Sequence, residues 1–119
     1  MLLVDRTFTD INVKDSTYYN RTALHYQARY GTTGSVAWLL RQDPPPGVNI
    51  VDSYHQYTPL MDAVISGEDS EGKVRLLLDH GADRDIKARY GLTALGYAKM
   101  WKKPAVIDML ENYRPDVSR

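Results

Sequence analysis

The sequence repeats one ten-residue pattern three times. The segments TALHYQARYG, TPLMDAVISG and TALGYAKMWK begin at Thr22, Thr58 and Thr93. The first two threonines lie 36 residues apart and the last two lie 35 residues apart. A chain with such a period builds its fold from copies of one small unit, so the repetition constrains the architecture more than any other feature.

Each copy continues with a break and then a second apolar run. These runs are VAWLL at 36–40, VRLLL at 74–78 and VIDML at 106–110. Unit one carries extra residues around the prolines at 44–46, and unit two carries extra residues between its two apolar segments. Without them, both spacings become 33. We expect the three prolines to form a solvent-exposed loop, because proline cannot continue a helix.

Local signals predict a pair of helices in each unit. The repeat threonines are good N-cap residues, and Pro59 stands in a first turn, where proline is tolerated. Gly81 follows the second run of unit two, where glycine commonly ends a helix. Apolar residues recur at helical spacing, and the expected core positions are Leu24, Leu60, Leu95, Val36, Leu39, Leu40, Val74, Leu77, Leu78, Val106 and Leu110. One helix pair is too small to bury its own apolar face, so neighbouring units should stack.

The repeat period of 33 residues resembles that of ankyrin repeats, whose first helix begins with the pattern Thr-Pro-Leu-His-x-Ala. The segment at 58–60 matches outright, and LLLDHGADRDI at 76–86 is similar to the family's helix end and following loop. The resemblance covers residues 10–113. It implies an all-α ankyrin-repeat solenoid of stacked helix-turn-helix units joined by β-hairpin-like loops. The implied boundaries within a single domain of residues 1–119 are a partial N-terminal repeat or cap at 1–13, repeats at 14–47, 48–83 and 84–113, and a tail at 114–119.

Composition narrows the classes of function. The 119 residues include 15 basic and 15 acidic side chains, so the formal charge is zero. Duplex nucleic acid and anionic membranes are therefore disfavoured as partners. The chain has no cysteine, which excludes disulfides and thiolate chemistry. Its sequence contains neither a signal peptide nor an apolar run of membrane-spanning length, and we expect an intracellular protein, cytoplasmic or nuclear.

The sequence predicts no catalytic, cofactor or metal site. His25, His55 and His80 are 30 and 25 residues apart, which matches no helical pair of metal ligands. The aspartates of GADRD at 81–85 are expected to bond nearby backbone rather than to act as acid and base. Phosphate-binding loops and nucleophile motifs are absent from the sequence. This pattern favours a binding protein over an enzyme.

Tyrosine is the unusual feature of the composition, with nine tyrosines against one phenylalanine. The resemblance to ankyrin repeats implies that a partner meets the hairpin tips and the exposed side of each first helix. Six of the nine tyrosines fall on those positions. The implied contact residues are Tyr18, Tyr19, Arg21, Arg29, Tyr30, Tyr54, His55, Tyr57, Ile65, Ser66, Arg89, Tyr90, Leu92, Met100 and Trp101. Four residues after the three repeat threonines come Tyr26, Asp62 and Tyr97, respectively. These residues are expected to border the same concave face, and Asp62 is included among the expected contact residues.

The same aromatic residues also have a packing interpretation. Tyr26 and Tyr97 replace aliphatic residues and are candidates for the core, and Trp38 is expected to pack between repeats. The first two hairpins are one or two residues longer than those of the family pattern, so the resemblance does not fix which residues lie at their tips. We favour a binding surface, because large exposed aromatic patches seldom lack a function and because Tyr, Trp and Arg dominate binding hot spots.

The resulting prediction is a protein–protein interaction module that acts as a binder, adaptor or inhibitor. The expected partner is another protein of unknown identity, with no metal, membrane or cofactor. One alternative is single-stranded nucleic acid, stacked on Tyr and Trp with arginines at the phosphates. Another is a recognition segment of a larger enzyme or scaffold. Salt separates the first alternative from protein binding, because nucleic-acid affinity falls steeply as salt rises.

Overall fold

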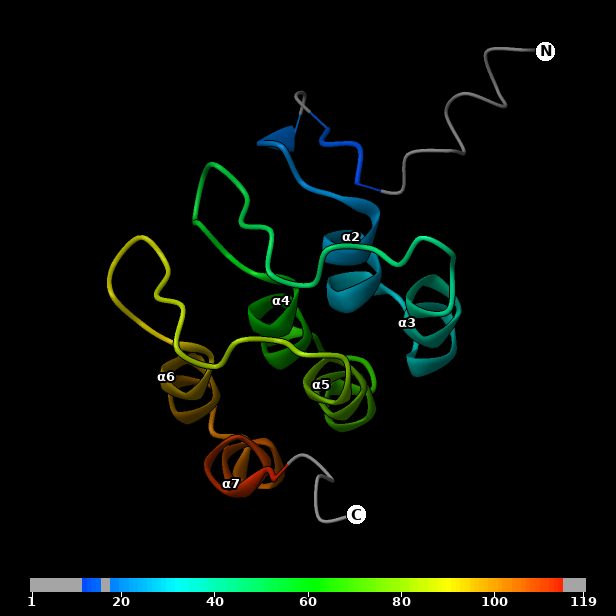
Figure 1. Ribbon diagram of the computed structural model, residues 1–119. Coiled ribbons are helices and arrows are strands. Elements are labelled where there is room, and N and C mark those ends of the chain that lie inside the picture. Colours follow the sequence, from blue (N-terminus) through cyan, green and yellow to red (C-terminus); the bar gives the residue numbers. More distant parts are fainter. Residues whose placement is uncertain (1–11, 16–17, 115–119) are drawn as a thin grey trace, which may run out of the picture.

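The computed structural model describes residues 12–15 and 18–114, and six helices run through this part of the chain. They are α2 (Ala23–Tyr30), α3 (Thr33–Leu40), α4 (Pro59–Ile65), α5 (Ser70–Asp79), α6 (Ala94–Met100) and α7 (Pro104–Asn112). Figure 1 shows that α2, α4 and α6 form one layer and that α3, α5 and α7 form the other. Among the described residues, the strand-like pairing is limited to an isolated bridge between Asp15 and Arg21. The predicted all-α repeat architecture is confirmed.

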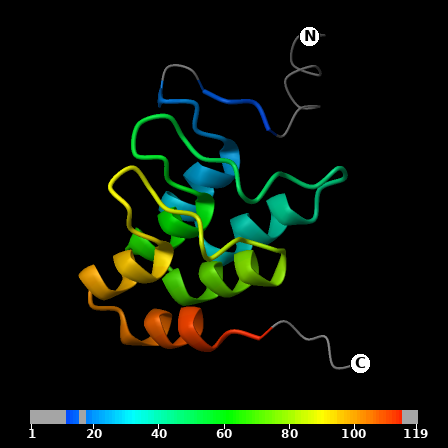
Figure 2. The same cartoon turned by 60° about the vertical axis from the view of Figure 1, so that its left-hand side comes forward.

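Successive units stack in the order of the sequence. Helix α2 contacts α4 and α4 contacts α6 in the first layer, while α3 contacts α5 and α5 contacts α7 in the second. Figure 2 shows the hairpin loops following one another along one side of the stack. Residues 1–11 of the expected partial repeat or cap, and residues 115–119 of the expected tail, lie outside the described residues.

The repeat threonines begin the first helices as predicted. The hydroxyl oxygens of Thr22, Thr58 and Thr93 each accept a hydrogen bond from the backbone N–H three residues later, at 3.2–3.4 Å. This bond satisfies one of the N–H groups that a helix leaves unpaired at its start. Pro59 occupies the first turn of α4, where it displaces no helical hydrogen bond.

Gly81 ends α5 in the way the sequence predicts. Its backbone is left-handed, with φ of 94°. The N–H of Gly81 donates to the carbonyl of Leu78 at 3.1 Å, and the N–H of Ala82 donates to the carbonyl of Leu77 at 2.9 Å. This pair of bonds is the Schellman arrangement, which needs a residue that tolerates positive φ.

The proline loop after α3 differs from the prediction. Pro44 and Pro45 are exposed as expected, but Pro46 is buried. The chain returns to the body of the protein immediately after it, because Val48 packs against the hydrophobic core and the N–H of Gly47 donates to the side chain of Asn12. Pro46 is therefore part of the packed structure and not of a solvent-exposed loop.

The hydrophobic core lies between the two layers and continues from one unit to the next. Leu24 and Leu60 are buried at equivalent places in α2 and α4. Leu95, at the same place in α6, is only half-buried because α6 ends the row of first helices. Leu77 is fully buried in α5, which lies between α3 and α7. Core burial thus depends on neighbouring units, as expected of a repeat protein.

Replacing a core leucine of the central unit should destabilise the whole described array. We expect Leu77→Ala to lower the free energy of unfolding by about 2–5 kcal/mol, because it leaves a cavity between units. Urea denaturation measures this loss. Arg75→Ala, on the exposed side of the same helix, is the matched control and should change stability by less than about 0.5 kcal/mol. Superimposed curves for Leu77→Ala and the wild type would contradict the register.

Candidate binding surface

Each hairpin is closed at its base by one backbone hydrogen bond. The bonds run from the N–H groups of Asp15, Asp52 and Ala88 to the carbonyls of Arg21, Tyr57 and Leu92, at 2.9, 3.1 and 2.8 Å. The first and second hairpins are therefore longer than the third. Gly91 turns the third hairpin with φ of 91°, whereas Tyr19, Asn20 and Gln56 adopt positive φ without being glycine. Such conformations are costly and persist where surrounding contacts impose them.

Asp52 holds the second hairpin in shape. Its side chain is 1% exposed, and its Oδ1 accepts hydrogen bonds from the backbone N–H groups of Tyr54, His55 and Gln56 at 2.8–3.2 Å. Its Oδ2 pairs with Arg21 of the preceding unit at 2.5 Å. Sequence reasoning did not select this residue. An aspartate at the start of a polar loop is a signal for such side-chain to backbone bonding.

The hairpins are also bonded to one another. The N–H of Ser53 donates to the carbonyl of Tyr19, and the N–H of Arg89 donates to the carbonyl of His55, both at 2.8 Å. The guanidinium of Arg89 donates to the carbonyls of Ser53 and Tyr54. The three hairpins therefore form one hydrogen-bonded row, which Figure 2 shows from the side.

Aromatic rings follow this row across the units. Tyr19 stacks on Tyr54 with ring centroids 4.7 Å apart, and Tyr54 meets His55 edge-on at 4.4 Å. His55 stacks on Tyr57 at 4.6 Å, and Tyr57 meets Tyr97 edge-on at 5.4 Å. The row begins at half-exposed rings and ends at Tyr97, which is 7% exposed and belongs to the core. The hairpin tyrosines therefore pack against neighbouring rings and, at Tyr19 and Tyr54, also remain about half exposed.

Other predicted contact residues form the exposed part of this side. Tyr90 is 82% exposed and Tyr30 is 73% exposed. More than half of the residue is also exposed at Tyr18, Tyr19, Tyr54, Met100 and Trp101. We call this set the aromatic face: Tyr18, Tyr19, Tyr30, Tyr54, Tyr90, Met100 and Trp101.

Several other predicted contact residues are less accessible. His55, Tyr57, Ile65 and Leu92 are half-buried, and all but His55 pack against the core. Ser66 is buried and accepts a hydrogen bond from the ammonium group of Lys73 at 2.8 Å. These residues are half-buried or buried next to the exposed residues of the aromatic face.

Trp38 contradicts its prediction. It was expected to pack between repeats, but it is 56% exposed on α3. Val36, Leu39 and Leu40 take up the buried side of this short helix, so the side chain at position 38 points away from the core. Trp38 lies on the second layer and is not part of the aromatic face.

Asp62 also differs from its prediction as a contact residue. Its side chain is 0% exposed, because Arg21 and Arg29 of the preceding unit pair with it at 2.8 and 3.3 Å. Burial raises the pKa of Asp62 to about 6, while the two arginines oppose this rise. The carboxylate thus anchors two arginines from the adjacent unit rather than meeting a partner. Arg29 remains partly accessible and lies over the Tyr30 ring, 5.7 Å from its centroid.

His25 joins the first unit to the second hairpin. The backbone N–H of Thr22 donates to its Nδ1 at 3.0 Å, and its Nε2 lies 2.9 Å from the carbonyl oxygen of Tyr57. A carbonyl only accepts, so Nε2 carries the proton and the ring is neutral. Burial lowers the pKa of His25, chiefly by disfavouring the charged form. His25 therefore links the start of its own helix to the second hairpin.

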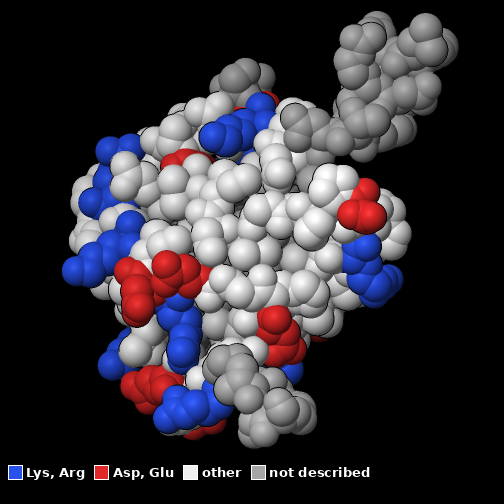
Figure 3. Space-filling view, in the orientation of Figure 1, with Lys and Arg blue, Asp and Glu red and all other residues white. Residues whose placement is uncertain are grey.

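Basic side chains accompany the hairpins. Figure 3 shows Lys and Arg along the left-hand edge, with Asp and Glu among them in its lower half; this is the side toward which the hairpins extend in Figure 1. In the hairpins and first helices, the exposed basic residues include Lys87, Arg89 and Lys102. Asp52 and Asp62, the carboxylates of the second unit on this side, are both buried.

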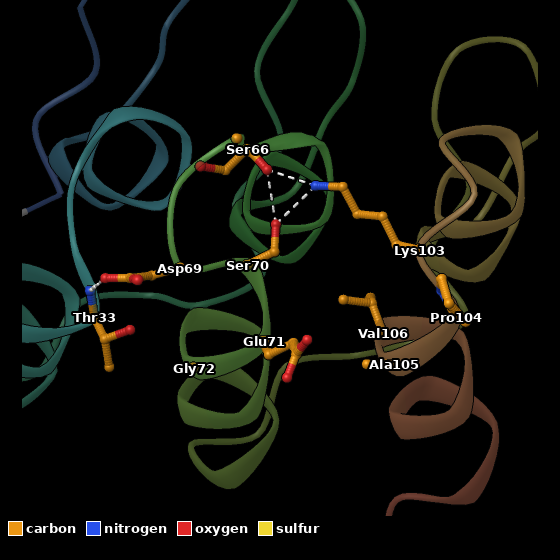
Figure 4. Close-up of a pocket in the computed structure, with 11 residues that line it drawn as sticks. Thr33, Ser66, Asp69, Ser70, Glu71, Gly72, Lys103, Pro104, Ala105 and Val106 are labelled. Carbon is orange, nitrogen blue, oxygen red and sulfur yellow. Dashed lines mark hydrogen bonds between the residues drawn. The ribbon is translucent and has the colours of Figure 1, made fainter.

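A cavity of about 700 Å³ opens on another part of the molecule, between the α4–α5 turn and the start of α7. Figure 4 shows Lys103 directed to Ser66 and Ser70. Its ammonium group donates to the Ser70 hydroxyl and to the carbonyls of Val64 and Ser66. Because an ammonium has three donors, this cation is fully occupied within the fold. The cavity wall thus caps the end of α4 and offers no free cationic group from Lys103.

Comparison with known proteins agrees with this architecture. The family model described as ankyrin repeats, in three copies, matches residues 1–87. The match covers well over half of the chain, and the protein belongs to the ankyrin-repeat family. Ankyrin repeats are generally protein–protein interaction modules and are typically not enzymes. No curated protein matches the chain.

The matched region ends before α6 and α7, which continue the same pair of layers. In the described part of the chain, none of the helices has the length and apolar character needed to cross a membrane. The same part of the chain contains no cluster of three or more His, Asp or Glu side chains arranged to hold a metal ion.

The His25 bridge predicts a pH effect on stability. Its folded-state pKa lies below the unfolded value of about 6.5. The folded protein then binds fewer protons at this group, so the contribution of His25 is complete above about pH 6.5 and is lost as the pH falls toward the folded pKa. His25→Gln should lower the free energy of unfolding by about 1–3 kcal/mol at pH 7.5, through loss of buried hydrogen bonds.

Urea denaturation at neutral and mildly acidic pH measures this effect. Asp62 acts in the opposite sense, because its raised pKa favours the folded state as the pH falls below about 6. The comparison is therefore between variant and wild type at each pH. The difference between them should shrink on acidification. A difference that stays constant would show that His25 is not held neutral by the fold.

Proposed function

We propose that the aromatic face binds another protein, and that the chain acts as a binder, adaptor or inhibitor. The observation that carries this proposal is the placement of large apolar side chains in solvent. Among those exposed in the described residues, only Val13, Trp38 and Val51 lie outside the aromatic face. An ordinary soluble surface does not gather its aromatic residues on one set of loops and helix ends.

The rigidity of the support favours recognition. The hairpins are bonded to one another through backbone atoms of Tyr19, Ser53, His55 and Arg89, and Asp52 fixes the second hairpin from within. A surface held in place before binding loses little conformational entropy when a partner docks. Tyrosine adds to this advantage, because it buries a large area with few rotatable bonds.

A contribution to folding does not explain why the most exposed residues of the aromatic face are aromatic. Tyr19 and Tyr54 stack on each other and gain stability from that contact. Tyr90, by contrast, is 82% exposed at a hairpin tip, and Trp101 is more than half exposed at the end of α6. Side chains with so little burial contribute little to the core and are suited to become anchors in a complex.

Truncating these two anchors should weaken binding without weakening the fold. The intact protein is used to capture its partner from cell extract, the partner is identified, and its affinity is then measured by titration. The variant Tyr90→Ala/Trp101→Ala should lose about 2 kcal/mol or more of binding free energy. Its free energy of unfolding should change by less than about 1 kcal/mol.

Trp38→Ala is the matched control, because it removes a similarly exposed aromatic side chain from the second layer. It should bind the same partner as the wild type does. A double variant that melts several degrees lower and binds unchanged would assign Tyr90 and Trp101 to packing. The binding surface would then have to be sought on α3, α5 and α7.

A further inference from the structure

The exposed charges of the protein are divided between its two layers. The hairpins and first helices comprise residues 12–15, 18–31, 48–66 and 84–102. Asp85 is the one exposed carboxylate in these described segments, because Asp52 and Asp62 are buried and Asp15 is half-buried. The basic residues of the same segments are Lys14, Arg21, Arg29, Arg84, Lys87, Arg89, Lys99 and Lys102.

The second layer has the opposite character. Residues 32–47, 67–83 and 103–114 contain every other exposed carboxylate of the described chain. These are Asp43, Glu68, Asp69, Glu71, Asp79, Asp83, Asp108 and Glu111. The formal charge of zero therefore conceals an uneven distribution, with an excess of positive charge on the side that carries the aromatic face.

We infer that the partner presents an acidic protein segment to the aromatic face, with its carboxylates against the third unit. This inference rests on the proposed function and specifies the partner's chemistry. Lys87 and Arg89 precede the tip residue Tyr90, and Lys102 follows Trp101. Residues 84–102 carry five basic side chains and one carboxylate, Asp85. Complementary charge speeds encounter and rejects partners of the wrong sign, while the aromatic anchors supply most of the affinity.

The geometry of the first two units agrees with this assignment. Arg21 is engaged by Asp52 and Asp62, and Arg29 by Asp62, so the fold itself balances much of their charge. The third unit has no such internal carboxylate. Lys99 is the exception in that unit, since it lies 3.9 Å from Glu111 of α7. The excess positive charge is therefore concentrated beside Tyr90 and Trp101.

A single-stranded nucleic acid fits this surface less well than a protein. Bases bind by stacking on free ring faces along a positive groove. One face of Tyr19 and one of Tyr54 are already covered by each other, with ring centroids 4.7 Å apart. Arg89 directs donors to the carbonyls of Ser53 and Tyr54 within the protein. Binding of single-stranded nucleic acid is therefore the competing outcome of the test below.

The test begins with a displayed library of short random peptides, selected against the intact protein at about 150 mM NaCl. Selected sequences should be rich in Asp and Glu next to aliphatic or aromatic residues. Synthetic copies are then titrated by fluorescence anisotropy, with single-stranded oligodeoxythymidylate as a second polyanion. The reversal Lys87→Glu/Lys102→Glu should weaken peptide binding by about tenfold or more.

Arg41→Glu/Arg75→Glu is the matched control, because it changes the net charge equally at exposed arginines of the second layer. It should leave the affinity within about twofold. Peptides without acidic residues that still require Tyr90 and Trp101 would overturn the inference and leave the proposed function standing. Peptides that bind independently of both anchors, or a library that yields none, would overturn both. Oligodeoxythymidylate that binds more tightly than the peptides would assign the surface to nucleic acid and overturn the inference.

Discussion

The structure depends on contacts between one unit and the next, because no helix pair buries its own apolar surface. Polar contacts also join one unit to the next. His25 of the first unit reaches the carbonyl of Tyr57 in the second, and Lys73 of α5 donates to the carbonyl of Gly31 at the end of α2 at 2.7 Å. Lys103 caps α4 from the following unit in a similar way. Each unit therefore completes its neighbour, and loss of one interface should be felt throughout the described array.

This dependence also explains how an exposed aromatic surface is kept in a defined shape. The hairpins are too short to be stable alone, but Asp52 and the inter-hairpin hydrogen bonds hold them in a row. Tyr19 and Tyr54 then stack on a support that is already fixed. Asp52 and Asp62, the buried carboxylates on this side, neutralise arginines of the first unit, which leaves the third unit with an excess of positive charge. Fold stability and surface chemistry thus come from the same interactions.

The fold was predictable from the sequence because its signals are local and periodic. Thr22 predicts a helix start from the residue itself, and the recurring apolar residues predict the buried stripe. The errors concern residues whose environment is set by another unit or by the return of a loop. Asp62 is buried because arginines of the preceding unit reach it, and Pro46 is buried because Val48 brings the loop back to the core. Trp38 is exposed because the short helix α3 turns other residues inward. For the candidate site, the sequence located the exposed tyrosines but not Asp52, whose role depends on contacts in three dimensions.

The central claim is that the hairpins and first helices, and not the second helices, form the binding side. Chemical-shift mapping of the isotope-labelled protein, titrated with a bound acidic peptide or the captured partner, tests it most directly. We expect perturbed backbone amides to cluster at residues 18–30, 53–57 and 87–102, and amides of α3 and α5 to stay unchanged. Perturbations confined to α3, α5 and α7 would contradict it.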